Sequence, residues 1–311
     1  MAEPQCNLII DSCCDLPHDL VEVDGVEVLQ FPYLMDDEQH SDDMFRSITA
    51  HDFYEKMRKG STPSTAQIPI TVFTELFERA AQSGVPTVYL SFTSGLSGSC
   101  DTARMVCDQV VAAHPGAELY VVDTLLPSIA EGVLVYEAIR QRAQGLTAQE
   151  MVAWSEEARY YVNDMFMVDD LESLRRGGRI PASVAFAGSK LDVKPLLNAE
   201  ALEGKLSLVG VARGRKKGIR QLAEFYRKRA IDTGVGNRVV IGSSDCPKDV
   251  DRLKAELEKV DERVLFMETS IGPVIGSHVG PGMLAIAFMG PDVREEASVS
   301  DRIARKVKAK K

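Results

Sequence analysis

The chain has 311 residues, about twice the commonest length of a single domain, so two domains are expected. Its 36 basic and 46 acidic side chains give a net charge of -10, which argues against a protein built to coat nucleic acid or an anionic membrane. The six cysteines have no C-x-x-C or zinc-like spacing, which fits reduced thiols. The sequence shows neither a signal peptide nor an apolar run of membrane-spanning length, so we expect a soluble, cytoplasmic protein.

In the first 150 residues, short apolar runs alternate with amphipathic stretches. Strands are predicted at residues 7–11, 26–35, 87–92 and 119–123. Helices are predicted at 71–84, from residue 101 onward, and at 129–145. This alternation favours a mainly parallel sheet that is covered on both faces.

The second half has a different pattern. A helix is predicted at 147–162, followed by a bridging segment at 164–178. Further strands are predicted at 206–212, 238–244, 263–270 and 283–290, with helices at 217–232 and 248–260. We therefore expect an α/β protein of two domains, a mainly parallel α/β domain at residues 1–155 and an α+β domain at residues 156–311.

The stretch "SFTSGLSGSC" at 91–100 places five hydroxyl side chains and two glycines between a predicted strand and a predicted helix. Ligands of parallel sheets bind at such strand-to-helix turns, where free backbone N–H groups and hydroxyls suit a small anion. The stretch has neither the lysine of a Walker A loop nor the spacing of G-x-G-x-x-G or G-x-S-x-G. The alternative is a tight turn with one capping serine, which accounts for a single hydroxyl.

Two other loops are open to a similar choice. "DSCCDLP" at 11–17 follows the first strand and is either a second crevice loop or a helix cap ahead of Pro17. "GSTPSTAQIP" at 60–69 offers four hydroxyls, which either bind a ligand or cap the following helix.

The second half contains two basic clusters, "LRRGGRIP" at 174–181 and "VARGRKKGIRQL" at 211–222. A solvated helix face is the usual meaning of such runs, and RNA binding is the alternative. No aromatic residue is interleaved in either cluster, so nucleic acid gains little support. His278 lies among glycines and prolines in a predicted loop at 270–282, and it serves either a structural role or a ligand that approaches the backbone closely.

Taken together, the motifs resemble those of the DegV family of fatty-acid-binding proteins, the lipid-carrying subunits of bacterial fatty acid kinase. The resemblance spans about residues 7–290, and it rests on "DSCCDL", "TAQ", "SGLSGS", "LRRGGRI", "KLDVKPLL", "RGRKK" and "IGPVIGSHVGPG". It implies a two-domain DegV-like fold with an apolar fatty-acid tunnel between or beside the domains.

By the same resemblance, Thr65, Ser94, Ser97 and His278 are implied as ligands of the fatty-acid carboxylate. Arg179 and Arg213 resemble the basic residues expected near phosphate chemistry and partner docking. The family's usual Thr-Ser-Gln-Pro is Thr-Ala-Gln-Ile here, at residues 65–68, so a hydroxyl at the second position is lost.

The function implied is that of a carrier rather than an enzyme. It would bind a long-chain fatty acid and present its carboxylate to a separate ATP-binding kinase, whose acyl phosphate product feeds phospholipid synthesis. No cofactor, metal or nucleic-acid partner is expected, and the resemblance leaves room for transient contact with a membrane. The alternative is a subunit of an enzyme acting on a small hydroxy-ketone or sugar, as in dihydroxyacetone kinases, with His278 taking part.

Overall fold

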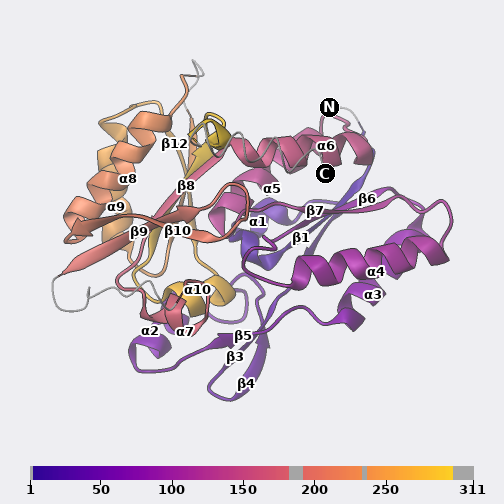
Figure 1. Cartoon of the computed structure of the whole chain (residues 1–311), viewed down its shortest axis with the longest axis horizontal. Helices are drawn as coiled ribbons and strands as arrows, with labels where there is room; N and C mark the ends of the chain where they lie inside the picture. Colours follow the sequence, from indigo (N-terminus) through magenta and orange to yellow (C-terminus); the bar gives the residue numbers. More distant parts are fainter. Residues whose placement is uncertain (1–2, 182–191, 233–236, 297–311) are drawn as a thin grey trace.

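The computed structural model describes residues 3–181, 192–232 and 237–296 (Figure 1). Sheet A has four parallel strands in the order β2-β1-β6-β7. Their bounds are β1 (Asn7–Asp11), β2 (Val26–Leu29), β6 (Thr87–Ser91) and β7 (Leu119–Asp123). The parallel sheet predicted for the first half is confirmed.

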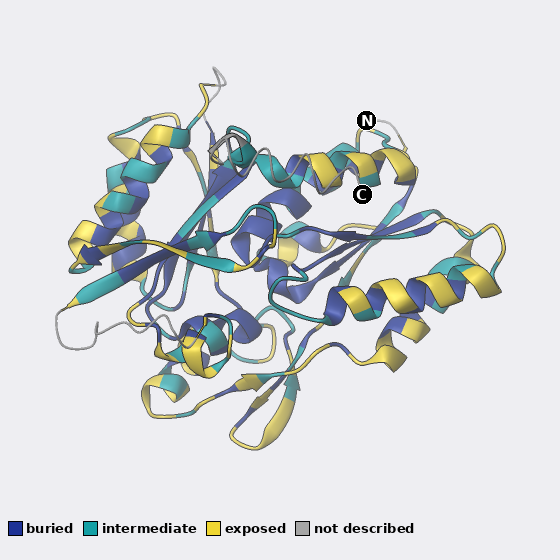
Figure 2. Cartoon of the chain, in the orientation of Figure 1, coloured by how far each residue is buried: buried dark blue, intermediate teal, exposed yellow. Residues whose placement is uncertain are grey.

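Helices cover both faces of sheet A, as Figure 1 shows. Helices α3 (Ile70–Ser83) and α4 (Ser99–Ala113) lie on one side, and α5 (Ile129–Arg142) and α6 (Ala148–Ala158) lie on the other. Every residue of β6 is buried, which is what two covered faces require (Figure 2). These helices correspond to those predicted from the apolar periodicity.

Sheet C, formed by the second half, is mixed and has the strand order β10-β9-β8-β13-β11-β12. Its strands are β8 (Val162–Met167), β9 (Val193–Ala199), β10 (Leu206–Arg213), β11 (Arg238–Ser243), β12 (Leu265–Ser270) and β13 (Leu284–Met289). Only β11 and β12 pair in parallel. One face carries α8 (Arg215–Arg229) and α9 (Pro247–Glu258), while α5 contacts β8, β11 and β13 on the other, inner face.

Helix α5 therefore lies between sheets A and C, and one continuous apolar core extends from sheet A to the inner face of sheet C. The central strands of both sheets are largely buried, as their dark blue colour in Figure 2 shows. The chain is thus an α/β protein whose two larger sheets are one parallel and one mixed. The predicted division at residues 155 and 156 falls inside α6, and the division itself remains a prediction. No helix in the described ranges combines the length and the apolar composition needed to cross a bilayer.

The prediction of a single strand at 26–35 is wrong, because the chain leaves sheet A after β2 and begins a new strand in another sheet. A third sheet, B, is antiparallel with the order β4-β3-β5 and contains β3 (Pro32–Met35), β4 (Glu38–Ser41) and β5 (Ser64–Thr65). Pro32 has no N–H group to continue a ladder. The N–H of Phe31 donates instead to the hydroxyl of Ser12, 3.1 Å away.

The loop predicted around His278 is also wrong, because it contains the helix α10 (Pro273–Val279). Two buried carboxyl groups hold its first turn: Asp15 accepts a hydrogen bond from Gly272 N at 2.8 Å, and Asp42 accepts one from Val274 N at 3.5 Å. The remaining short helices are α1 (His18–Val21), α2 (Ala50–Arg58), α7 (Glu172–Arg176), η1 (Ser12–Cys14), η2 (Arg159–Tyr161) and η4 (Val293–Glu296).

Candidate functional site

The described residues line a cavity of about 290 Å³ between the inner face of sheet C, α5, α10 and the turn at 92–98. Ligand sites in proteins usually measure roughly 300–1,000 Å³, so the cavity is at the lower edge of that range. Most of its walls are apolar. Its polar lining residues are Thr65, Gln67, Ser97, Ser128, Asp164, Arg179 and His278. A cavity of this kind suits a largely apolar ligand with a polar group.

His278 lies in the last turn of α10, and its Nε2 atom is 2.8 Å from the hydroxyl oxygen of Thr65 on β5. Its Nδ1 atom is buried and has no hydrogen-bond partner among the residues described. Burial, together with the positive charges of Arg179 and Arg176, lowers the pKa of His278 to about 4. The imidazole is therefore neutral at pH 7 and can donate one hydrogen bond.

Arg179 follows α7 and reaches the serine-rich turn. Its Nε atom donates to the carbonyl oxygen of Leu96 at 3.1 Å, and its Nη1 atom donates to that of Gly177 at 2.6 Å. Burial lowers the pKa of Arg179, but an arginine side chain stays charged. Within the described part of the chain, no carboxylate pairs with this guanidinium. It therefore brings a positive charge to the cavity that the described residues do not neutralise.

Gly177 allows the imidazole of His278 to approach the backbone just before Arg179. A Cβ atom at this position would overlap Nδ1 of His278. The backbone φ of Gly177 is -74°, so any residue type could adopt its conformation. The glycine is needed here for the close approach of the imidazole.

Most hydroxyls of the serine-rich turn hold loops together. Thr93 and Ser99 are buried, with Thr93 donating to the carbonyl of Gly204 at 3.0 Å and Ser99 accepting from the N–H of Ile68 at 3.2 Å. Ser97 is the hydroxyl residue of this turn that lines the cavity, and its Oγ atom lies 3.1 Å from that of Ser99. The number of hydroxyls thus reflects loop packing as well as the cavity.

Four of the six predicted site residues meet in this one cavity, namely Thr65, Ser97, Arg179 and His278. Ser94 is not among the lining residues, and its backbone N–H donates to the carboxylate of Asp123 at 3.1 Å. Arg213 is the last residue of β10, is exposed, and does not line the cavity. The ligand-binding roles of all six residues remain predictions.

The two other loops singled out in the sequence are also placed. In the 11–17 loop, Asp11 caps η1 by accepting from Cys13 N at 3.1 Å, and it also accepts from Phe92 N at 2.9 Å. Its complete burial raises the pKa of Asp11 to about 7. The loop is thus both a cap and a support of the serine-rich turn. Helix α3 begins after Pro69 without a side-chain cap, so the alternative that the 60–69 hydroxyls cap it is wrong.

Asp164 is a lining residue that was missed in the sequence. It is an acidic residue inside the apolar strand β8, and it faces the same cavity as the other polar residues. A lone charge within the run "DMFMV" was the available signal, because a buried carboxyl needs a specific partner or a functional reason.

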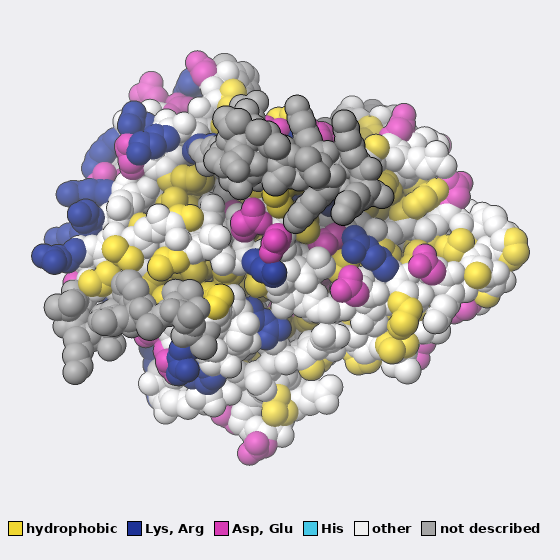
Figure 3. Space-filling model, viewed as in Figure 1, with side chains coloured by type: hydrophobic (Ala, Val, Ile, Leu, Met, Phe, Trp, Pro, Cys, Tyr) yellow, Lys and Arg dark blue, Asp and Glu magenta, His cyan; other side chains and the backbone are white. Residues whose placement is uncertain are grey.

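The second basic cluster forms the solvated face of α8, where Figure 3 shows Lys and Arg side chains gathered at the left of the molecule. Arg215, the first residue of α8, forms ion pairs with Asp169 at 2.7 Å and with Asp249 at 2.5 Å. Lys216 and Lys217 are exposed. This arrangement agrees with the solvated-face interpretation.

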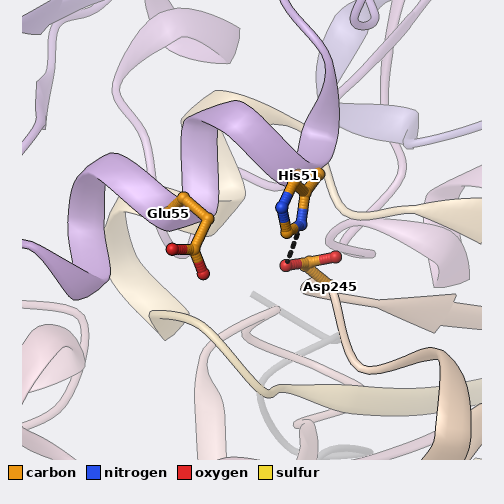
Figure 4. A group of neighbouring side chains, drawn as sticks. All are labelled: His51, Glu55 and Asp245. Carbon is orange, nitrogen blue, oxygen red and sulfur yellow. Dashed lines mark hydrogen bonds and ion pairs between the residues drawn. The ribbon is translucent and has the colours of Figure 1, made fainter.

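His51, Glu55 and Asp245 form a second polar group, drawn in Figure 4, with ligand-type atoms within 4.8 Å of one another. The guanidinium of Arg58 already bonds both carboxylates, at 2.8 Å to Glu55 and 2.5 Å to Asp245. Because this cation competes for the same oxygens, we interpret the group as a clamp that joins α2 to the loop after β11.

Comparison with known proteins relates the whole arrangement to one family. The family model described as "Uncharacterised protein, DegV family" matches residues 5–290. A DegV domain-containing protein of Clostridium perfringens, CPE0026, is 33% identical over 289 residues, which is 93% of this chain and 98% of that protein.

Solved structures of DegV proteins have the same fold. A DegV family protein from Thermus thermophilus, described as binding a fatty acid, has a TM-score of 0.79 and 28% identity, covering 92% of this chain and 100% of that one. DegV from Bacillus subtilis, described as a fatty acid binding protein, has a TM-score of 0.78 and 25% identity, covering 93% of this chain and all of that one. The chain belongs to the DegV family.

Proposed function

We propose that the protein binds a long-chain fatty acid, with its carboxylate at Thr65, Ser97, Arg179 and His278, hereafter the head-group set. The observation that carries this proposal is that one cavity joins apolar walls to several hydrogen-bonding side chains and to a guanidinium that no described carboxylate neutralises. A buried carboxylate needs charged or hydrogen-bonding partners. Each buried CH₂ group of the chain adds about 0.8 kcal/mol. The DegV relatives described as fatty-acid-binding support the same ligand class.

An enzyme acting on a small hydroxy-ketone or sugar would need a cavity whose walls are mainly polar. The cavity has aromatic and aliphatic residues on most of its surface, so this alternative is not retained.

The test is native mass spectrometry of the freshly purified protein, followed by extraction and lipid analysis of whatever is released. We expect one fatty acid per chain. A protein that carries no lipid and takes up neither added oleate nor added palmitate would contradict the proposal.

We propose further that a separate ATP-binding kinase phosphorylates the bound carboxylate, while this chain only holds and presents it. The strand register supports a docking edge. Met167, the last residue of β8, pairs with Leu196 of β9. Three residues farther along β9, Val193 pairs with Arg213 of β10. The exposed Arg213 therefore lies beyond the end of β8 from which the chain continues into α7. The half-buried Arg179 comes after α7, the helix that follows β8 in the chain. Cations at these two positions would suit a reaction that passes a phosphoryl group to a carboxylate.

The reaction would form an acyl phosphate and ADP from the carboxylate and ATP. It is tested by mixing the loaded protein, the ATP-binding subunit of a fatty acid kinase, ATP and hydroxylamine, which traps an acyl phosphate as the hydroxamate. We expect hydroxamate only when all components are present, and less of it with Arg213→Ala at unchanged fatty-acid binding. Hydroxamate formation without the kinase would contradict the division of labour.

A further inference from the structure

The inner face of sheet C carries one carboxyl group inside the cavity. Side chains alternate along β8, so Asp164 and Phe166 point to the same face, and both line the cavity. Asp164 pairs with Ala287 of β13, and Met167 pairs with Leu284. From Met167 the chain continues into α7, which precedes Arg179, and Leu284 follows α10, which contains His278. This end of β8 therefore adjoins the head-group set. Asp164 lies three residues farther along, which is about 10 Å in a strand.

This carboxyl group has unused hydrogen-bonding capacity. Both its oxygens share one donor, the N–H of Ala199, at 3.2 and 3.1 Å. A carboxylate offers about four acceptor positions. Among the residues described, no lysine, arginine or histidine forms an ion pair with Asp164, and burial raises its pKa to about 7. At neutral pH the group can therefore either accept or donate a hydrogen bond.

An unsubstituted acyl chain is a poor neighbour for such a group. Methylene groups packed against the carboxyl would remove water from it without replacing the lost hydrogen bonds, which is unfavourable. A hydroxyl on the chain at this depth would fill the same space and bond to the carboxyl. The small side chain of Ala287 opposite Asp164 limits competition from the protein itself.

We infer that the preferred ligand is a hydroxylated fatty acid, whose mid-chain or distal hydroxyl bonds Asp164 while its carboxylate lies at the head-group set. This inference rests on the proposed function and narrows its ligand class. None of the other polar residues described in the lining belongs to a strand of sheet C, so Asp164 is the specificity-determining residue of the sheet C wall.

The experiment measures dissociation constants at pH 7.5 for octadecanoate and for its 2-, 10- and 12-hydroxy derivatives. We expect the wild-type protein to bind the better of the 10- and 12-hydroxy acids about tenfold more tightly than octadecanoate, since one buried hydrogen bond to a polar partner has about that value. The 2-hydroxy acid should gain nothing, because its hydroxyl lies beside the carboxylate.

Two variants and a control sharpen the result. Asp164→Leu should abolish the preference and bind octadecanoate more tightly, whereas Asp164→Asn, which keeps an acceptor and a donor, should retain part of it. Leu206→Met changes another lining residue at similar volume and should leave the ratio unchanged.

The outcomes separate the two proposals. If the wild type binds all these acids but does not favour a 10- or 12-hydroxyl, or if Asp164→Leu leaves the ratio unchanged, the hydroxyl inference is wrong and fatty-acid binding stands. If none of the acids binds, the proposed function fails and this inference fails with it.

Discussion

The two ends of the cavity are built in different ways. The head-group end collects four polar side chains from β5, the serine-rich turn, the segment after α7 and α10, which are far apart in the sequence. The other end is a wall formed by strands of sheet C and by α5, and Asp164 is the one polar side chain among the sheet C residues described in this lining. Under the proposed function, charge and hydrogen-bond geometry at the first end select a carboxylate. At the second end, the shape of the cavity and the carboxyl group of Asp164 select the acyl chain.

The carboxyl group of Asp164 should lower the free energy of unfolding at neutral and alkaline pH. Asp164→Asn should be more stable than the wild type by roughly 2–4 kcal/mol at pH 8, and equally stable near pH 4. The pKa of Asp164 rises from 3.8 to about 7 on folding. Between these values the folded state holds the extra proton, so wild-type stability falls as the pH rises through this window, and asparagine removes that loss.

Urea unfolding at pH 4, 6 and 8 measures this difference, with the exposed Asp108→Asn as the matched control. If the free energy of unfolding changed with pH in the same way in Asp164→Asn and the wild type, burial of Asp164 would not destabilise the folded protein.

At the head-group end, Arg179→Ala should weaken fatty-acid binding about 10- to 100-fold, because it removes charge-assisted hydrogen bonds to the carboxylate. Arg179→Lys keeps the charge but loses the planar donor fork, so its fatty-acid affinity should lie between those of the wild type and Arg179→Ala. Competition with a fluorescent fatty acid measures both. Wild-type affinity in Arg179→Ala would mean that the carboxylate lies elsewhere.

Gly177→Ala tests the close approach at the same end. Its methyl group would push the imidazole of His278 out of place, and we expect about tenfold weaker binding. Gly210→Ala on β10 is the control, since its added methyl group meets only ordinary contacts of 3.8 Å to Leu196. Equal affinities of the two variants would show that the position of His278 does not matter for binding.

The smallest effect distinguishes two serines of one turn. Ser97→Ala should weaken binding about threefold, because Ser97 lines the cavity. Ser94→Ala should change binding less than twofold, because Ser94 is not among the described lining residues and its backbone N–H bonds to Asp123. Direct titration of each variant with palmitate measures the pair. A larger loss for Ser94→Ala would reverse the assignment.

The sequence predicted sheet A and its helices well, because apolar periodicity is strong where strands such as β6 are buried on both faces. It did not predict α10, whose seven residues include proline and glycine and which depends on two carboxyl groups distant in the sequence, Asp15 and Asp42. Nor could it separate Ser94 from Ser97, since that choice depends on the contact of Ser94 with Asp123. The role of Asp164 likewise depends on strand register.

In the proposed function, a fatty-acid carboxylate lies beside Arg179 and His278 in this cavity. The most direct measurement is carbon-13 NMR of bound palmitate labelled at its carboxyl carbon, titrated with acid in the wild type and in Arg179→Ala. If the carboxylate lies beside Arg179, we expect a single bound resonance whose position shows an ionised carboxyl group below pH 4 in the wild type. In the variant, the bound carboxyl group should become protonated at a higher pH. A bound carboxyl group with the same ordinary pKa in both proteins would contradict it.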